Sequence, residues 1–271
     1  MRTCIDIGGT KVLIANVDES GKILNSYKFK TPSDYPEFLK QTKTELAKFE
    51  ISDKTIVVGV PAKVNRETGT CAEYFGNRDW EHVPIASDIS KILGGKKVVI
   101  ENDANLAGLG EYYALNDPRP HEALYVTIST GIGTGFVKDG TLDPDQIDSE
   151  GGHMLLERDG KFVSWESIAS GKSIVARYDK LASEITSQDD WKDITKDIAV
   201  GFVNVFSISQ PDIVIIGGGV GSSFERFEQP LMQWLKEIAP KMIDIPPFVK
   251  ASKPEEAVIL GAYQLSKQLD A

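Results

Sequence analysis

Cysteine is nearly absent from this chain, and long apolar runs are missing as well. Only Cys4 and Cys71 occur in 271 residues, so the sequence supports neither a disulfide framework nor a zinc site built from cysteines. No apolar run approaches the roughly 18 residues that a membrane span needs, and no signal-peptide pattern opens the chain. We therefore expect a reduced, cytoplasmic protein without a membrane partner.

Positive charge is also in deficit. The chain has 30 Lys and Arg against 40 Asp and Glu, a formal net charge of −10. Nucleic-acid backbones need clustered Lys and Arg, so this balance argues against a nucleic-acid partner. The hydrophobic content of 41% and the charged content of 26% are ordinary for a globular protein, and the length predicts one or two domains.

Two glycine-rich turns stand out. The first is Asp6-Ile7-Gly8-Gly9-Thr10-Lys11, and a similar pattern returns at Ser129-Thr130-Gly131-Ile132-Gly133-Thr134-Gly135. In both places an apolar run meets a Gly/Thr turn and leaves into a second β-rich run. Either turn alone is typical of a glycine hairpin, and a P-loop or dinucleotide fold would need a helix directly after the glycines. Two such turns favour a duplicated fold that holds a polyphosphate against exposed backbone N–H groups.

Apolar strands alternate with amphipathic helices in both halves of the chain, which indicates α/β domains. The segment 116–120, Asn-Asp-Pro-Arg-Pro, breaks a predicted helix and is the expected hinge. We expect an N-terminal domain over 1–116, with a C-terminal helix at 255–271 packing back on it, and a second domain over 117–254.

Asn102-Asp103 follows a predicted buried strand and opens a predicted helix, a usual place for ligand contacts in α/β sheets. Asp103 there is either a helix N-cap or a general base that takes a hydroxyl proton during phosphoryl transfer, with Asn102 holding a neighbouring hydroxyl.

Three further patterns bear on ligand binding. Glu150-Gly151-Gly152-His153 places a carboxylate and an imidazole on one loop, although a surface histidine is the simpler interpretation. Residues 170–173 resemble part of a Walker A loop but lack its first glycine and its preceding strand, so we reject that interpretation. Residues 212–221 look like a dinucleotide fingerprint without its acidic partner, and we interpret Gly218 and Gly219 as backing a nucleoside or phosphate tail.

Taken together these stretches resemble the ROK family of sugar kinases, within the actin/hexokinase/Hsp70-like fold. Six motifs occur in the family's order: residues 6–11, 58–61 with 67–69, 101–105 with 109–111, 129–135, 150–154 and 216–220. Residues 101–111 are the most specific of them. Asn77 with Trp80 is similar to the family's Asn-x-x-Trp region.

The resemblance implies two ribonuclease-H-like α/β domains with a cleft between them. It also implies a Mg²⁺-dependent kinase that transfers a phosphoryl group from ATP to a hexose hydroxyl, with glucose and its 6-hydroxyl expected, in a homodimer. Asp103 would be the base, and the sugar would be held by Asn77, Asn102, Asp103, Glu150, His153 and Glu166. Asp6 would orient Mg²⁺ through water, and the donor would contact Gly8, Gly9, Thr10, Lys11, Thr130, Gly131, Gly133, Thr134, Gly218 and Gly219.

One departure from the family concerns metal. The family's Cys-rich zinc loop is replaced by residues 158–166, which contain no cysteine, while Glu166 and Ala169-Ser170-Gly171 keep their places. We therefore expect no zinc. Short members without these cysteines are similar to polyphosphate-dependent glucokinases, so polyphosphate is an alternative donor, and fructokinase or N-acetylmannosamine kinase activities are alternatives for the sugar. A catalytically silent sugar sensor is the non-enzyme alternative, and a DNA-binding repressor is disfavoured because the chain opens directly on the phosphate strand.

Overall fold

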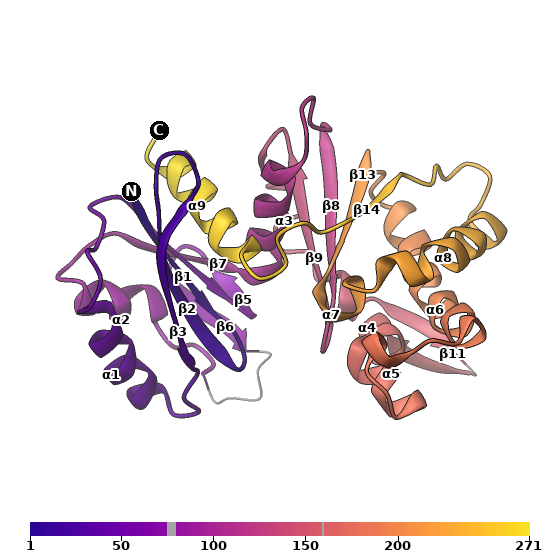
Figure 1. Cartoon of the computed structure of the whole chain (residues 1–271), viewed down its shortest axis with the longest axis horizontal. Helices are drawn as coiled ribbons and strands as arrows, with labels where there is room; N and C mark the ends of the chain where they lie inside the picture. The colour runs from indigo at the N-terminus through magenta and orange to yellow at the C-terminus, as the bar shows by residue number, and fades with distance from the viewer. Residues whose placement is uncertain (75–79, 159) are drawn as a thin grey trace. The chain divides into compact units, whose positions relative to one another are not determined.

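Two compact units make up the chain in the computed structural model, which describes residues 1–74, 80–158 and 160–271 (Figure 1). Unit 1 contains residues 1–113 and 255–271, and unit 2 contains residues 114–254. Each unit is built on its own five-stranded sheet. Within the described ranges, no helix combines the length and apolarity needed to cross a membrane.

The sheet of unit 1 has the strand order β3-β2-β1-β4-β7. β1 pairs antiparallel with β2 and parallel with β4, and β4 pairs parallel with β7. β4 is buried along its whole length, as expected for a continuous apolar run in the middle of a parallel region. The elements are β1 (Arg2–Ile7), β2 (Lys11–Val17), β3 (Ile23–Lys30), α1 (Tyr35–Leu46), β4 (Ile56–Val60), β5 (Ala62–Asn65), β6 (Thr70–Tyr74), α2 (Ile85–Ile92), β7 (Val98–Asn102), α3 (Asp103–Ala114) and α9 (Ala257–Leu269).

The sheet of unit 2 repeats this plan with the order β10-β9-β8-β13-β14. β8 pairs antiparallel with β9 and parallel with β13, as β1 does with its neighbours. The same sequence of strand directions in both units supports the duplication that the two glycine turns predict. The elements are β8 (Glu122–Ile128), β9 (Ile132–Lys138), β10 (Thr141–Leu142), β11 (Leu155–Arg158), β12 (Lys161–Ser164), α4 (Trp165–Ala169), α5 (Gly171–Tyr178), α6 (Gln188–Phe206), β13 (Ile213–Gly217), α7 (Gly218–Gly221), α8 (Phe224–Ile238) and β14 (Phe248–Lys250), with 3-10 turns at Gly151–His153 and Ala182–Glu184.

The sequence pattern predicts one helix over about 165–184, and this prediction is wrong, because the structure divides the segment into α4, α5 and a 3-10 turn. Ser170 between α4 and α5 is extended, with φ −77° and ψ 166°, and its hydroxyl accepts a hydrogen bond from Ser173 N at 3.3 Å. The N–H of Gly171 donates to the carbonyl of Ser129 at 2.6 Å instead of continuing the helix. Capping and a long-range backbone bond therefore override the local helical pattern.

Helices α3 and α9 cross at unusually short range in unit 1. A Cβ added at Gly261 would lie 1.8 Å from the carbonyl oxygen of Leu106, and one at Gly110 would lie 2.2 Å from the carbonyl oxygen of Ala257. Real carbon and oxygen atoms cannot approach so closely, so both glycines are required by the crossing. α3 is buried on nearly every side, which fixes the helix that begins at Asp103.

The end of α9 is attached to the sheet of unit 1 through Asp270. Its carboxylate accepts hydrogen bonds from the Thr55 hydroxyl at 2.6 Å, from the Thr55 N–H at 3.2 Å and from Arg2 Nη1 at 2.5 Å. The Thr55 hydroxyl, followed by the Arg2 guanidinium, lowers the pKa of Asp270 to about 2. A carboxyl whose pKa falls on folding stabilises the protein above its unfolded pKa and loses that contribution as the pH falls toward the folded value.

Replacing Asp270 by Asn is expected to lower the free energy of unfolding by about 1 kcal/mol at pH 7, since the bonds to an ionised acceptor are lost at a partly exposed position. Thermal unfolding of both proteins from pH 8 down to pH 3 checks this. The difference between them is expected to be constant above about pH 5 and to shrink below about pH 4. A difference that grows as the pH falls would contradict this assignment.

Candidate active site

Asn102 and Asp103 lie at the junction of β7 and α3. Asn102 Oδ1 accepts hydrogen bonds from the N–H groups of Ala104 at 2.9 Å and Asn105 at 3.2 Å, which is how an N-cap side chain satisfies the first turn of a helix. Its amide also donates to the carbonyl of Ala62 at 3.3 Å. The capping role that the sequence allows for Asp103 is thus filled by Asn102. Asp103 is the residue directly after the cap, in the first turn of α3, and its side chain is partly buried.

Glu101, to which the sequence analysis assigns no role, anchors this junction. Its side chain is 3% exposed and receives both Nε and Nη2 of Arg66, each at 2.7 Å, in a bidentate ion pair. Oε1 also accepts hydrogen bonds from the Asn102 N–H at 2.8 Å and from Asn105 Nδ2 at 3.0 Å. These partners compensate the burial of the charge and fix the backbone that leads into Asp103.

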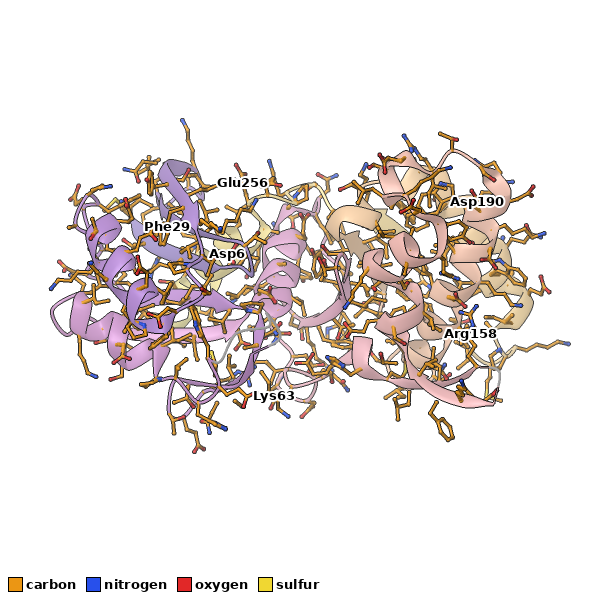
Figure 2. All side chains as sticks on the ribbon, turned by 90° about the horizontal axis from the view of Figure 1, so that it is seen from below. Asp6, Phe29, Lys63, Arg158, Asp190 and Glu256 are labelled. Carbon is orange, nitrogen blue, oxygen red and sulfur yellow. The ribbon has the colours of Figure 1, made fainter. Side chains whose placement is uncertain are left out.

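Asp6, labelled in Figure 2, lies near the carboxyl end of β1. It is in register with Gly59 of β4, which is in register with Glu101 of β7. Burial raises the pKa of Asp6 to about 7, and the negative charge of Asp103 adds to the rise. Lys11 and Lys28 lower it in part. Two carboxyl groups that repel each other at the edge of a sheet form a donor set that fits a divalent cation, because Mg²⁺ takes oxygen ligands and relieves such repulsion.

The first glycine turn joins β1 to β2. The N–H of Gly8 donates to the carbonyl of Lys11 at 2.9 Å, which closes a hairpin. Thr31, the residue after β3, supports this turn through two hydrogen bonds. Its hydroxyl donates to the Gly8 carbonyl at 2.8 Å, and its N–H donates to the Thr10 carbonyl at 3.0 Å. A Cβ at Gly9 would meet nothing within 4 Å, so the missing side chain leaves the backbone there open. Lys11 forms an ion pair with Glu255 at 3.0 Å.

The second glycine turn joins β8 to β9 in the same way. The N–H of Ser129 donates to the carbonyl of Gly131 at 2.8 Å, and Thr130 is exposed at the tip. Gly133 and Thr134 lie beyond the turn, inside β9. Thr134 is 4% exposed, and its hydroxyl donates to the Ser149 carbonyl at 3.2 Å and accepts from the Gly151 N–H at 3.1 Å. Its side chain therefore supports the loop that carries Glu150.

His153 and Glu166 are brought together beside this second turn. His153 Nδ1 lies 3.9 Å from Glu166 Oε1, and Glu166 Oε2 accepts a hydrogen bond from the Ile132 N–H at 3.3 Å. A Cβ at Gly131 would lie 2.5 Å from Glu166 Oε2, so the glycine makes room for the carboxylate. Glu150 immediately precedes the 3-10 turn that ends at His153. A carboxylate, an imidazole and a further carboxylate supply the acceptors and donors that sugar hydroxyls need.

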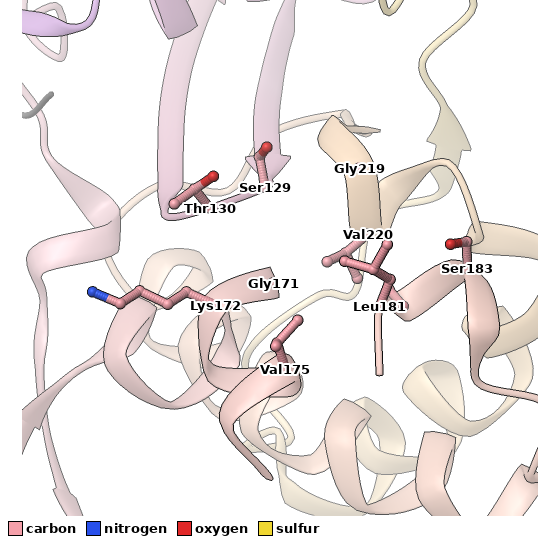
Figure 3. Close-up of a pocket in the computed structure, with 10 residues that line it drawn as sticks. Ser129, Thr130, Gly171, Lys172, Val175, Leu181, Ser183, Gly219 and Val220 are labelled. Carbon is pink, nitrogen blue, oxygen red and sulfur yellow. The ribbon is translucent and has the colours of Figure 1, made fainter. Parts of the chain in front are cut away.

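A cavity of about 420 Å³ opens beside the turn in unit 2 (Figure 3). The turn contributes Ser129 and Thr130, and the remaining lining residues are Gly171, Lys172, Val175, Leu181, Ala182, Ser183, Gly219 and Val220. The lining is mostly apolar, with hydroxyls at the turn. A planar base and a sugar fit such a cavity, with the phosphates directed to the N–H groups of the turn.

Of the residues that the sequence assigns to the phosphoryl donor, Thr130 and Gly219 line this cavity and Gly218 is not in its lining. The lining residues between 171 and 183 were not predicted. Their one signal was the Ser-Gly-Lys-Ser pattern at 170–173, which we rejected as a Walker A loop. The structure uses it differently, because Gly171 packs against the backbone of Ser129 and Lys172 lines the cavity. Asn77 lies outside the described residues. Within the described part of the chain, no group of three or more His, Cys, Asp or Glu side chains is arranged to hold a metal ion.

The chain is similar to known proteins over nearly its whole length. The ROK family model matches residues 2–269. An N-acetyl-D-glucosamine kinase of Haemophilus influenzae is 30% identical, with 96% of this chain and 97% of that protein aligned. A crystal structure of a ROK family glucokinase from Streptomyces griseus, in complex with glucose and AMPPNP, is 25% identical with a TM-score of 0.80, and 98% of this chain and 99% of that chain are covered. An inorganic polyphosphate/ATP-glucomannokinase from Arthrobacter sp. is 26% identical with a TM-score of 0.73, and both chains are covered completely.

Proposed function

The chain belongs to the ROK family of sugar kinases, and we propose that it transfers a phosphoryl group from ATP to a hexose, with glucose and its 6-hydroxyl as the preferred acceptor. The observation that carries this proposal is the junction of β7 and α3. There Asn102 supplies the helix cap, and Asp103 follows it on a buried, firmly anchored helix.

In the proposed reaction Asp103 accepts the proton of the sugar hydroxyl as that oxygen bonds to the γ-phosphorus of ATP, while the bond from this phosphorus to the β,γ-bridging oxygen breaks and ADP leaves. Asn102 has one amide hydrogen bonded to Ala62, and its second N–H is assigned to a neighbouring hydroxyl. Glu150, His153 and Glu166 are assigned to the remaining hydroxyls of the ring. Fixing the hydroxyl against its base converts a bimolecular step into a nearly unimolecular one.

The two glycine turns are assigned to the phosphates of the donor. The Gly8 N–H is engaged with the Lys11 carbonyl, so the N–H groups of Gly9 and Thr10, and of Thr130 and Gly131, are assigned as the neutral donors that an anion can approach closely. Asp6 would hold Mg²⁺ through water, and the ion, when bound, supplies positive charge to the phosphates. The chain's own contribution is to keep Asp6 desolvated and close enough to Asp103 for the two charges to interact.

ATP is the proposed donor because the cavity beside the second turn is lined mostly by apolar groups, including Val175, Leu181 and Val220. An adenosine can bury its base against these side chains, whereas a polyphosphate chain has no apolar part to place there. Gly219 offers open space, since a Cβ there would meet nothing within 4 Å.

A coupled assay tests the proposal. The purified protein is supplied with Mg²⁺, either ATP or polyphosphate, and one of glucose, mannose, fructose, N-acetylglucosamine or N-acetylmannosamine. Turnover of glucose with ATP is expected to give the highest kcat/KM. A higher value with polyphosphate would replace the donor, and a higher value with another sugar would replace the acceptor. Sugar binding without any turnover would favour the silent sensor.

Replacing Glu166 by Gln is expected to raise the KM for the sugar by roughly ten- to a hundredfold, because a charge-assisted hydrogen bond contributes about 1.5–3 kcal/mol. The KM for ATP is expected to change less than about threefold, since Glu166 is assigned to the sugar alone. Steady-state kinetics with each substrate varied in turn measures both constants.

Glu157→Gln is the matched control for Glu166→Gln. Glu157 is an exposed carboxylate on β11, and its recorded contact is with the N–H of Gly160. Both KM values are expected to stay near those of the unmodified protein. A Glu166→Gln variant that weakens ATP binding instead would remove Glu166 from the sugar site.

A further inference from the structure

His153 and Glu166 lie at the two ends of the β11–β12 hairpin. His153 is separated from β11 by one residue, Met154, and Glu166 is the second residue of α4, the helix that follows β12 directly. The base of the hairpin is closed by the Trp165 N–H, which donates to the Met154 carbonyl at 2.9 Å. Whatever holds this hairpin against the rest of unit 2 therefore also sets where the imidazole and the carboxylate lie within that unit.

The hairpin is attached to α6 through two of its residues, Trp165 and Arg158, and both contact Asp197. Trp165 is fully buried, and its indole N–H donates to the main-chain carbonyl of Asp197 at 3.2 Å. Its ring lies so close to Gly201 that a Cβ there would stand 1.9 Å from it. At the far end of the hairpin, Arg158 Nη1 reaches the carboxylate of Asp197 at 2.7 Å (Figure 2 labels Arg158). Asp197 therefore contacts both the root and the far end of the same hairpin.

A second arginine completes the arrangement. Arg177 of α5 places Nη1 2.7 Å from the same oxygen of Asp197, and its Nη2 donates to the Ile168 carbonyl of α4 at 2.9 Å. The Asp197 side chain is 12% exposed, so its charge is largely removed from water and depends on these guanidinium groups. One carboxylate thus joins β11, α4, α5 and α6.

We propose that Arg158, Asp197 and Arg177 form an ion-pair clamp that positions His153 and Glu166 for the sugar. None of the three is a catalytic residue, because each acts through the hairpin and α4. The inference rests on the proposed assignment of His153 and Glu166 to the sugar. Releasing the clamp lets the hairpin shift against α6, which moves His153 and Glu166 out of position for the sugar, whereas the first glycine turn, in unit 1, keeps its contacts.

Kinetics of three variants tests the clamp. Arg158→Met is expected to raise the KM for glucose by about fivefold, and Asp197→Asn by about tenfold, since a partly exposed pair contributes less than a buried one. In Arg158→Met, kcat and the KM for ATP are expected to stay within about twofold. Asp197→Asn also releases Arg177 of α5, and α5 lines the cavity, so its KM for ATP is expected to rise as well. Arg158→Lys keeps the charge and is expected to recover most of the loss, which simple loss of packing would not predict.

Lys161→Met is the matched control, because Lys161 pairs with Arg158 across the same hairpin and is exposed. Hydrogen exchange of residues 155–164 is measured in every variant without sugar. Faster exchange and a raised KM in Arg158→Met and Asp197→Asn, with neither in Lys161→Met, is the expected result. An unchanged KM for glucose, or equal changes in Lys161→Met, would overturn the clamp while leaving the kinase proposal intact. If the unmodified protein neither turns over nor binds any of the sugars, the proposed function fails and the positioning role fails with it.

Discussion

Replacing Asp103 by Asn is expected to lower kcat by about 10²–10⁴, the range usually lost with a general base. The amide keeps the shape of the carboxylate and can still hydrogen bond to a sugar hydroxyl, but it cannot take the proton. The KM for the sugar is therefore expected to change only a few-fold. Because Asn102 supplies the cap of α3, the substitution is not expected to weaken the helix.

Rapid-quench and steady-state assays with glucose and ATP measure this effect, and calorimetric titration measures sugar affinity separately. Asp53→Asn is a suitable control, because Asp53 is an exposed carboxylate of the same unit whose recorded partner is Lys96. Its kcat is expected to match that of the unmodified protein. A kcat within twofold of normal for Asp103→Asn would exclude Asp103 as the base.

Replacing Gly261 by Ala is expected to lower the free energy of unfolding of unit 1 by about 3 kcal/mol. Helix propensity alone predicts the opposite, since Ala is about 1 kcal/mol better than Gly inside a helix. The added Cβ would stand 1.8 Å from the Leu106 carbonyl oxygen, so α3 and α9 must move apart. The steric cost exceeds the gain in propensity.

Denaturant and thermal unfolding measure this loss, and Gln264→Ala on the same helix is the control, because Gln264 is only partly buried. A second consequence is functional. Since Asp103 opens α3, a displaced α3 is also expected to lower kcat in Gly261→Ala. Stability equal to or greater than that of the unmodified protein would mean that the two helices do not cross as described.

The long apolar strands were predictable because their signal is local. The apolar runs predict strands over 2–7 and 11–17, where β1 and β2 lie, and over 55–60 and 212–216, from which β4 and β13 differ by one residue at one or both ends. The β5–β6 and β11–β12 hairpins were missed, since their strands are short and β12, Lys161–Ser164, carries little apolar pattern. The sequence of residues 158–166 indicates only a loop. The contacts of Arg158 and Trp165 with α6, which hold this segment, are visible only in the structure.

The candidate site was predictable to a different extent. Motif order pointed to the two turns and to Asn102-Asp103, because these stretches are continuous in sequence. Nothing local to Glu101 indicates that Arg66, 35 residues earlier, neutralises it, and nothing in Thr134 indicates that its hydroxyl faces Gly151. Such pairings arise only when distant segments pack, so they were accessible from the structure alone.

The membership of α9 in unit 1 has a consequence for biosynthesis. Unit 2 is one continuous stretch of chain, 114–254, whereas unit 1 is complete only when residues 255–271 have been made. Until then the ribosome-bound chain exposes the apolar surface of Leu13, Val57 and Leu106, which the mature protein covers with Ile259 and Tyr263. Exposed apolar surface of this kind recruits chaperones and promotes aggregation. The N-terminal strand, although translated first, is thus among the last parts of the protein to reach its final environment.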